Sequence, residues 1–272
     1  PTVLRMMVQE NLSAYNLQFR QCVAAGEPLN PDVIDKWLKG TGTIIRDGYG
    51  QSETTCLACN LPGAAVKYGS MGKPTFMYDL VIADDNGHEV QALEEGHICI
   101  RMDEKRPNGV FTEYLGDPER RKKVFRNGLY FTGDKAYKDE DGFIWFVGRN
   151  DDVIKASDYR IGPFEVESVL IEHDAVVEAA VVASPHELRG YAVKAFVVLA
   201  DGINGNKELA EELFAFSEKN LAVFKIPRII EFIEAFPKTI SGKIRRVELR
   251  MQEGTDKVNQ VKKEMEFYHQ KY

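Results

Sequence analysis

One change of pattern along the chain constrains its fold more than any other feature of the sequence. Up to the polar stretch Gly148-Arg149-Asn150-Asp151-Asp152, short apolar segments alternate with turn signals such as Asp85-Asn86-Gly87, which is typical of antiparallel strands. Beyond that stretch the pattern runs helix, strand, strand, helix, strand, which predicts a compact α+β unit with a three-stranded sheet. We therefore expect two folding units joined by a short linker.

The first unit is expected to begin with helices and to continue as an antiparallel, barrel-like β region. One helix is predicted to begin after Asn30, with Pro31 at its first position, and to be ended by Gly40 and Gly42. A polar loop is predicted at 47–54. Helices are also predicted at 2–9 and 118–125, and strands at 43–46, 78–83, 96–102, 110–114, 129–132 and 143–147.

The second unit is predicted from longer periodic segments. The charged tail, 257–272, is expected to be a solvated helix that packs one side on this unit. Before it we expect helices at 163–172 and 207–221, strands at 176–183, 192–199 and 228–232, and a long basic loop.

Composition excludes several classes of function. The 272 residues carry 35 Lys and Arg against 42 Asp and Glu, and the net charge of −7 argues against a nucleic-acid partner bound through its phosphates. No apolar run reaches the ~18 to 20 residues of a membrane span. Four cysteines are too few for a disulfide scaffold, which favours a reducing compartment, and we expect the cytoplasm. Because the chain begins at Pro1, we also expect it to be part of a longer protein.

Three polar segments have the composition of a nucleotide and magnesium site. Tyr49-Gly50-Gln51-Ser52-Glu53-Thr54 offers backbone N–H groups, short hydroxyls and one carboxylate, although an ordinary polar turn has the same composition. Thr132-Gly133-Asp134 is predicted to end a strand, where a carboxylate can hold the two hydroxyls of a ribose; an ordinary turn aspartate is the alternative. Lys243 lies on the glycine-hinged segment 237–246, which is either a mobile cation for a phosphoryl group or a solvated basic turn.

Cysteine and histidine spacing does not predict a metal centre. Cys56 and Cys59 have the spacing of half a zinc site or of a redox pair, but no second pair and no histidine couple accompanies them. The five histidines are scattered without the spacing of ligands. We therefore expect surface or internally hydrogen-bonded histidines.

A series of segments along nearly the whole chain carries a family resemblance. They are Ala25-Gly26-Glu27-Pro28-Leu29, Tyr49 to Thr54, Gly69-Ser70-Met71-Gly72-Lys73-Pro74, Thr132-Gly133-Asp134, Gly148 to Asp152, Tyr159 to Glu167 and Pro237 to Arg246. In this order they resemble the motif series of the adenylate-forming superfamily, and most of all AMP-forming acyl-CoA synthetases of the acetyl and medium-chain type. The resemblance implies the end of a large AMP-binding domain at 1–148, a hinge at 149–152 and a small mobile C-terminal domain at 153–272.

The resemblance implies a two-step acid-thiol ligase that uses ATP, Mg²⁺ and coenzyme A. A carboxylate attacks the α-phosphate of ATP to give an acyl-adenylate and pyrophosphate, and the thiol of coenzyme A then displaces AMP. Lys243 matches the family's mobile catalytic lysine, which assists the first step. Asp151 matches the hinge residue about which the small domain turns for the second step. Ser52 is a further catalytic candidate, and Glu53 matches the catalytic Mg²⁺ ligand.

The resemblance also implies binding roles, position by position. Asp134 matches the carboxylate that holds the ribose, and Thr54 joins Ser52 as a positioning group for phosphate and carboxylate. The ATP and AMP candidates are Gly26, Glu27, Pro28, Asp47, Gly48, Tyr49, Gly50, Gln51, Ser52, Asp134, Arg149 and Arg160. The coenzyme A candidates are Ser157, Asp158, Tyr159 and Arg189.

Two departures from the family pattern have consequences. Asp158 stands where the family usually has glycine, beside the path of the pantetheine arm, and its carboxylate would either narrow that path or repel the phosphates of coenzyme A. The glycine-rich phosphate loop that should precede Gly26 is absent from the chain. We therefore expect the C-terminal half of a synthetase, and no ligase activity from this chain alone.

Two other functions are alternatives to coenzyme A ligation. An adenylating module that loads an acyl group onto a carrier protein is the alternative, although segment 159–167 is more similar to the acetyl and medium-chain synthetases. An inactive binding protein is disfavoured because Glu53, Asp134, Arg149 and Lys243 are all present. The expected partners are a small carboxylic acid, ATP and coenzyme A.

Overall fold

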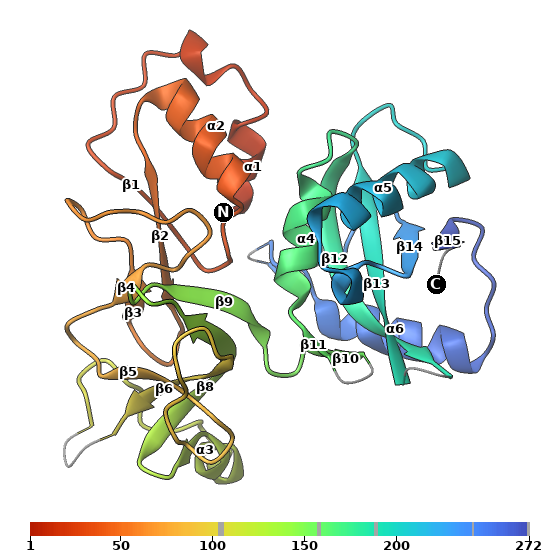
Figure 1. Cartoon of the computed structure of the whole chain (residues 1–272). Helices are drawn as coiled ribbons and strands as arrows, with labels where there is room; N and C mark the ends of the chain where they lie inside the picture. The colour runs from red at the N-terminus through yellow and green to blue at the C-terminus, as the bar shows by residue number, and fades with distance from the viewer. Residues whose placement is uncertain (103–105, 157–158, 188–189, 241, 271–272) are drawn as a thin grey trace. The chain divides into compact units, whose positions relative to one another are not determined.

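Two compact units, Pro1–Asn150 and Asp151–Tyr272, make up the chain (Figure 1). The computed structural model describes residues 1–102, 106–156, 159–187, 190–240 and 242–270. Each unit has hydrophobic clusters of its own.

The first unit opens with a β-α-β arrangement. β1 (Cys22–Ala25) pairs in parallel with β2 (Ile45–Gly50), and α2 (Pro31–Thr41) connects them. The helix begins as predicted because the Asn30 side chain accepts a hydrogen bond from the Asp32 amide at 2.7 Å. It ends before Gly42, whose φ of 71° favours glycine. The neighbouring elements are α1 (Thr2–Met7), the 3-10 helix η1 (Leu12–Ala14), β3 (Cys56–Cys59) and β4 (Lys73–Pro74).

Strand β2 is placed later in the chain than the strand predicted at 43–46. It begins at Ile45 and runs to Gly50, so that the first four residues of the predicted loop at 47–54 are strand. The sheet order is β1-β2-β3-β4, and Gly48 is paired with Ala25 on one side and with Cys59 on the other. Because β2 is an inner strand, its ladder hydrogen bonds outweigh the turn preference of Asp and Gly.

An antiparallel sheet of order β5-β6-β8-β7, with β9 also paired to β8, forms the rest of the first unit. This β-rich part confirms the predicted fold class. The polar helix is confirmed as well, since the Asp117 carboxylate accepts a hydrogen bond from the Arg120 amide at 2.9 Å. The elements are β5 (Leu80–Ala83), β6 (Gly96–Arg101), α3 (Pro118–Val124), β7 (Phe125–Arg126), β8 (Leu129–Lys138) and β9 (Ile144–Arg149).

Two strand predictions in this sheet were wrong. Residues 110–114 form no strand; instead the Phe111 amide donates to the Glu53 carbonyl oxygen at 2.8 Å, and the Phe111 ring packs 5.6 Å from the Tyr130 ring. The strand predicted to end at 132 continues as β8 to Lys138. Asp134 therefore lies inside a strand, next to a register shift at Lys135 and Ala136, because β9 continues the pairing beyond the Thr132-Gly133 turn signal.

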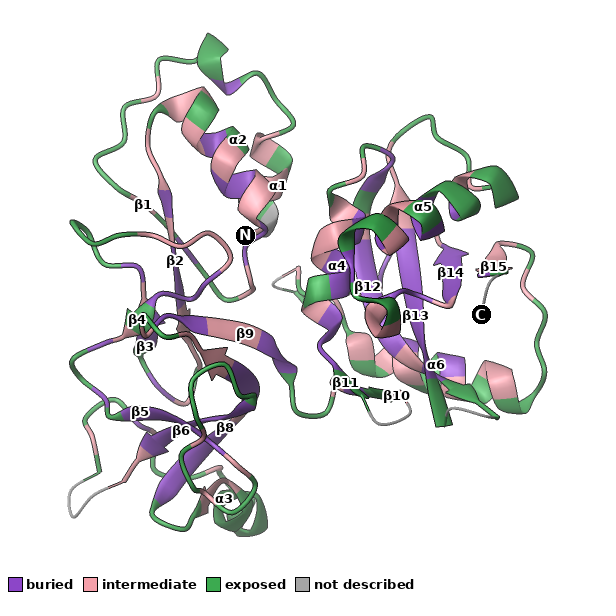
Figure 2. Ribbon diagram, in the orientation of Figure 1, coloured by how far each residue is buried: buried purple, intermediate pink, exposed green. Residues whose placement is uncertain are grey.

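The second unit is a sheet of order β12-β13-β14-β15 covered by helices on both faces. α4 and α5 pack on one face through Val166 and Leu213, and α6 packs on the other through Leu249. Figure 2 shows how much of β12 and β13 is buried between these layers. The elements are β10 (Ile154–Ala156), β11 (Tyr159–Ile161), α4 (Pro163–Ile171), β12 (Val176–His186), β13 (Gly190–Leu199), α5 (Lys207–Asn220), the 3-10 helix η2 (Val223–Lys225), β14 (Ile229–Phe232), α6 (Arg246–Val258) and β15 (Glu266–Tyr268).

The end of the chain differs from the prediction. The helix predicted at 257–272 lies earlier, as α6, and β15 adds a fourth strand to the predicted three-stranded sheet. The reason is the ammonium group of Lys194, which is fully buried in β13. Its Nζ atom lies 2.5 Å from the Glu253 carboxylate of α6 and also contacts Glu266 of β15. Glu266, which belongs to the predicted solvated tail, is in fact a counter-ion of this buried lysine, together with Glu253 of α6.

Candidate functional site

The predicted nucleotide segment continues β2 into a tight turn in the first unit. The Thr54 amide donates to the Gln51 carbonyl oxygen, and the Gln51 amide donates to the Thr54 hydroxyl, both at 3.1 Å. A Cβ atom at Gly50 would lie 2.4 Å from the Thr55 carbonyl oxygen, so this turn requires glycine. Ser52 at the tip is exposed and Glu53 is half-buried. The segment thus presents a hydroxyl and a carboxylate on a close backbone turn.

The carboxylate of Asp134 brings this segment and β8 together. The Tyr49 hydroxyl and the Gln51 side-chain amide both donate to Asp134 Oδ2 at 2.6 Å. The same Gln51 amide also donates to the Thr132 carbonyl oxygen at 3.0 Å. Asp134 is only 5% exposed, and donors aimed at a buried carboxylate stabilise its charged form. Three of the predicted nucleotide residues therefore meet at one atom.

Tyr49 remains a hydrogen-bond donor at this contact. Burial raises the pKa of Tyr49 well above its usual value, and the charge of Asp134 raises it further. The phenol is therefore protonated at neutral pH and holds the Asp134 carboxylate in one orientation.

Two tyrosines that sequence reasoning missed extend this network. The Tyr130 hydroxyl donates to Gln51 Oε1 at 3.0 Å, so that the amide nitrogen of Gln51 faces Asp134. The Tyr114 hydroxyl donates to Glu53 Oε1 at 3.0 Å. Their partners lie 79 and 61 residues away along the chain, and no local signal predicts such pairs.

Arg149 ends β9 beside Asp134. The two residues are register partners, and the Arg149 guanidinium lies 3.8 Å from the point that a Cβ atom at Gly133 would occupy. The Asn150 amide donates to the Gly133 carbonyl oxygen at 2.8 Å. An exposed cation thus stands next to the buried carboxylate.

The predicted adenine strip follows β1. Gly26 has a φ of 98°, which favours glycine, and the Glu27 carboxylate forms an ion pair with Arg5 at 2.9 Å. Pro28 completes the strip and is half-buried.

Asp47 lies in β2, where it pairs with Ala24 of β1, and it is 4% exposed. Its carboxylate accepts a hydrogen bond from the Gly48 amide at 2.9 Å. Burial nevertheless raises the pKa of Asp47 to about 7. A second, titratable carboxyl group therefore precedes the nucleotide segment in the same strand.

Lys243 lies in the second unit on a short antiparallel turn. Lys238 and Ile244 are bridge partners, and the Thr239 amide donates to the Lys243 carbonyl oxygen at 2.9 Å. The Lys243 amide in turn donates to the Thr239 hydroxyl at 3.1 Å. Gly242 has a φ of 85°, as the turn requires. The Lys243 side chain is exposed.

The remaining candidates of the second unit are only partly described. Tyr159 and Arg160 of β11 are exposed, and the Tyr159 ring stacks on Phe224 with centroids 4.3 Å apart. Asp151 forms an ion pair with Arg250 of α6 at 3.6 Å. The candidates Ser157, Asp158 and Arg189 lie outside the described residues.

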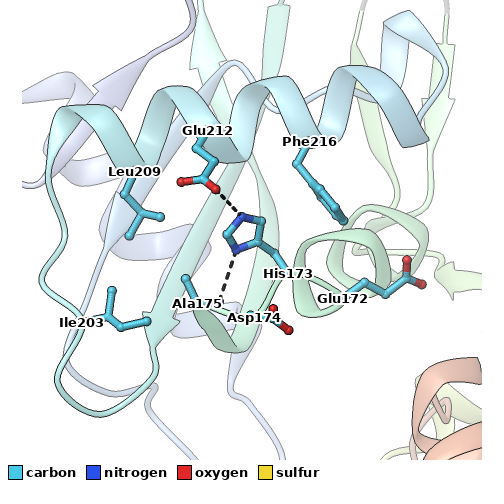
Figure 3. Close-up of a pocket in the computed structure, with 8 residues that line it drawn as sticks. All are labelled: Glu172, His173, Asp174, Ala175, Ile203, Leu209, Glu212 and Phe216. Carbon is cyan, nitrogen blue, oxygen red and sulfur yellow. Dashed lines mark hydrogen bonds and ion pairs between the residues drawn. The ribbon is translucent and has the colours of Figure 1, made fainter.

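A surface cavity of the second unit does not include any of these candidates. Its volume is about 510 Å³, and His173 lines it with its Nε2 atom 3.3 Å from the Glu212 carboxylate (Figure 3). The Ala175 amide donates to His173 Nδ1 at 3.2 Å, so this histidine is hydrogen-bonded within the fold, as expected. The lining residues are Glu172, His173, Asp174, Ala175, Ile203, Leu209, Glu212 and Phe216.

Among the described residues, one group of carboxylates is close enough to hold a metal ion: Glu231, Glu253 and Glu266. The Lys194 ammonium already occupies this place, 2.6 Å from Glu231 and 2.5 Å from Glu253. We therefore assign the group a structural role. Elsewhere, Cys56 and Cys59 are free thiols. In the described part of the chain, no helix combines the length and the apolar character needed to cross a membrane.

Comparison with known proteins agrees with this arrangement. The family of AMP-binding enzymes matches residues 1–115, and the AMP-binding enzyme C-terminal domain matches residues 165–243. The chain is 47% identical over 256 residues to the mitochondrial acyl-coenzyme A synthetase ACSM3 of Mus musculus, covering 93% of this chain and 44% of that protein. It is 51% identical over 255 residues to 4-hydroxybutyrate–CoA ligase 1 of Metallosphaera sedula, covering 93% and 45%.

Solved structures show the same fold. The anthranilate CoA ligase AuaEII in complex with anthranoyl-AMP superposes with a TM-score of 0.87 at 34% identity, over 95% of this chain and 49% of that one. A benzoate CoA ligase from Burkholderia xenovorans superposes with a TM-score of 0.80 at 36% identity, over 92% and 50%. The chain spans less than half of the length of the curated relatives named above. The two family matches and these relatives show that the chain belongs to the AMP-binding, adenylate-forming enzymes.

Proposed function

We propose that this chain is the C-terminal half of an AMP-forming acyl-CoA synthetase. The complete protein joins a carboxylic acid to coenzyme A with the cleavage of ATP to AMP and pyrophosphate. The observation that carries the proposal is the Asp134 carboxylate, which receives hydrogen bonds from Tyr49 and Gln51 at 2.6 Å beside the Glu53 turn. Relatives that are named CoA ligases support the same reaction class.

The first unit would bind the nucleotide. A buried, oriented carboxylate is the group that recognises the two hydroxyls of a ribose, and Asp134 has that form. Arg149, its register partner, would contact the ribose or the phosphates. The Tyr49 ring would cover one face of the adenine beside Gly26 and Glu27. Ser52, at the exposed tip of the turn, would position the phosphates.

The Glu53 turn fits Mg²⁺. One oxygen of Glu53 accepts the Tyr114 hydrogen bond at 3.0 Å, which fixes the orientation of a hard oxygen ligand next to the phosphate-positioning turn. Glu53 would hold the ion directly or through water. When bound, Mg²⁺ neutralises phosphate charge.

The reaction would proceed in two steps that use different parts of the second unit. In the first, a carboxylate oxygen bonds to the α-phosphorus of ATP while the bond to pyrophosphate breaks, and Lys243 stabilises the charge that develops. In the second, the coenzyme A thiolate bonds to the acyl carbon, and AMP leaves. We propose that the second unit turns about Asp151 between these steps and that Tyr159 and Arg160 contact coenzyme A or AMP phosphates.

Pyrophosphate exchange by the complete protein tests the proposal. The assay measures return of labelled pyrophosphate into ATP for straight-chain acids from acetate to decanoate and for 4-hydroxybutyrate, without coenzyme A. Exchange with one or more acids, followed by thioester formation when coenzyme A is added, is the expected result. Exchange without any thioester would indicate transfer to a carrier protein instead. Absence of exchange with every acid would contradict the proposed function.

The acid and the compartment belong to the same proposal. We propose a short- to medium-chain carboxylate as substrate. A cytoplasmic location rests on the reduced state expected for the four cysteines, and relatives at 47% identity carry a mitochondrial designation. Localisation of the tagged complete protein separates these two compartments.

A further inference from the structure

The turn that carries Lys243 is joined to the fold by a partly buried ion pair, Arg246–Glu167, whose two members have no assigned role. Arg246 is the first residue of α6 and follows Lys243 by three positions. Its Nε donates to Glu167 Oε1 at 3.1 Å, and its Nη2 donates to Glu167 Oε2 at 2.6 Å. Two parallel hydrogen bonds fix the plane of a guanidinium group as well as its distance from the carboxylate.

Glu167 is itself held in a fixed position. It lies on α4, it is 4% exposed, and its Oε1 atom also accepts a hydrogen bond from the Val181 amide at 2.8 Å. Val181 belongs to β12, which is an edge strand of the sheet. One carboxylate therefore ties α4, the edge of β12 and the first residue of α6 together.

The other end of the turn is fastened to the same strand. The Lys238 ammonium contacts the Glu178 carboxylate of β12 at 2.8 Å, and Phe236 is buried against the sheet. The Arg245 amide donates to the Pro237 carbonyl oxygen at 2.8 Å and closes the base of the turn. Both ends of the turn are therefore joined to β12, whereas Lys243 and Ile240 near its tip are exposed.

We propose that Arg246 and Glu167 are positioning residues for Lys243. By fixing the start of α6 against α4 and β12, the pair sets the place and direction from which the lysine reaches its target. Neither residue touches the reacting atoms. This inference rests on the proposed function of Lys243 in adenylation. It assigns to the pair an effect on the first half-reaction only.

Two kinetic assays of the complete protein test the inference. Adenylation is measured by pyrophosphate exchange, and the second half-reaction by thioester formation from a supplied acyl-adenylate and coenzyme A. Glu167→Gln keeps an acceptor for the Val181 amide but loses the charge, and a displaced lysine should slow adenylation on the order of 100-fold. Arg246→Lys keeps the charge and loses the paired hydrogen bonds, and a smaller loss of about tenfold is expected. Thioester formation should stay within about twofold of wild type in both variants.

Two further variants calibrate the assay. Lys243→Ala sets the largest loss that adenylation can show. Glu165→Gln is the matched control, because Glu165 lies on the same helix, is exposed and pairs with Lys225 at 2.5 Å. It should leave both half-reactions unchanged. Equal losses in the two half-reactions would show that the Arg246–Glu167 pair only supports the fold, and unchanged adenylation would refute the inference as well.

Hydrogen exchange on the 272-residue chain gives a readout that does not depend on activity. The amides of Thr239, Gly242 and Arg245 are hydrogen-bonded within the turn, and their exchange should speed up in Glu167→Gln and Arg246→Lys but not in Glu165→Gln. Unchanged exchange would refute the anchoring. If the wild-type protein shows no pyrophosphate exchange with any acid, the proposed function fails, and the catalytic part of this inference fails with it. The amide hydrogen-exchange rates still decide whether the Arg246–Glu167 pair holds the turn.

Discussion

Replacement of the buried Lys194 by methionine should destabilise the second unit severely. The Lys194 side chain is 0% exposed and contacts three carboxylates, Glu231 at 2.6 Å, Glu253 at 2.5 Å and Glu266. Methionine has a similar length and can fill the space beside the Phe196 ring, so that the loss is mainly one of charge. The variant therefore isolates the electrostatic part of the packing.

The magnitude follows from what each carboxylate keeps. Glu231 retains Lys263 at 2.9 Å, and Glu266 retains Lys257 at 3.3 Å. Glu253 is 0% exposed, and beyond the Ser184 hydroxyl at 2.6 Å the nearest lysines lie 3.7 and 3.9 Å away. Breaking a buried pair by removing one partner costs about 3–5 kcal/mol. This is a large part of the ~5–15 kcal/mol that stabilises a typical domain.

Urea unfolding of the chain measures the effect one unit at a time. Both tryptophans, Trp37 and Trp145, lie in the first unit, so fluorescence reports on that unit and far-ultraviolet circular dichroism reports on both. Lys194→Met should move the dichroism transition to lower urea and leave the fluorescence transition in place.

The dependence on pH supplies a second check. Burial alone would raise the pKa of Glu266, but hydrogen bonds from Lys194 and Tyr268 outweigh it and lower that pKa. The contribution of the charged Glu266 to the stability of the folded state is therefore complete above the pKa of glutamate in the unfolded chain, about 4.3. This contribution is lost as the pH falls through the lower pKa of Glu266 in the folded state. In Lys194→Met the buried carboxylates can take up protons instead, so the difference from wild type should shrink between pH 7 and pH 4. A decrease of less than about 1 kcal/mol in the free energy of unfolding of the second unit at pH 7 would refute the electrostatic reasoning. It would also be refuted if adding Glu253→Gln to Lys194→Met restored none of the lost stability.

Three other outcomes follow from single sites. Lys243→Ala in the complete protein should slow pyrophosphate exchange by about 100- to 1000-fold and leave thioester formation from acyl-adenylate unchanged; equal losses would contradict the assignment. Burial raises the pKa of Asp47 to about 7, so between about pH 4 and pH 7 the folded state keeps a proton on Asp47 that the unfolded state has released. The stability of the first unit should therefore fall as the pH rises through that range. Asp47→Asn should abolish this fall when fluorescence midpoints are compared at pH 5 and pH 8. Gly50→Ala should destabilise the first unit by about 1–3 kcal/mol because its Cβ would lie 2.4 Å from the Thr55 carbonyl oxygen. Gly254→Ala, with open space on α6, should instead stabilise the second unit by about 0.5–1 kcal/mol. Changes in stability of the same sign and size in the two variants would contradict the steric argument.

Local signals predicted where α2 and α3 begin, whereas the helix predicted at 257–272 was wrong. Asn30 and Asp117 cap their helices through side-chain hydrogen bonds to the next turn, as the residue type and the following proline indicate. These interactions join residues two and three positions apart, so a short window of sequence contains all of the physics that decides them.

Strand predictions failed where pairing overrode local preference. Gly48 belongs to a strand although its neighbours indicate a turn, because two other strands satisfy its backbone. Residues 110–114 have the composition of a strand but form a loop. Both edges of β8 are already paired, one with β6 and the other with β7 and β9, and the Phe111 amide donates to the Glu53 carbonyl oxygen instead. Pairing partners lie too far along the chain for local reasoning.

Some residues of the candidate site were predictable from the sequence and others were not. The identity and order of Tyr49, Glu53, Asp134 and Lys243 indicated adenylate chemistry before any coordinates, because the family resemblance depends on residue types along the chain. Their orienting partners were not predictable: Tyr130 and Tyr114 act across 79 and 61 residues.

By itself, the sequence determined that the chain forms two units, that Asn30 and Asp117 cap their helices, and that the motif residues of an adenylate-forming enzyme follow one another in order. Only the tertiary structure decided that Glu266, predicted to lie in a solvated helix, is a counter-ion of the buried Lys194, 72 residues away, and that Glu253 shares this role. The physical reason is that a charged side chain has no fixed preference for surface or core: its burial is favourable only when an opposite charge is brought within contact, and the fold alone supplies that partner.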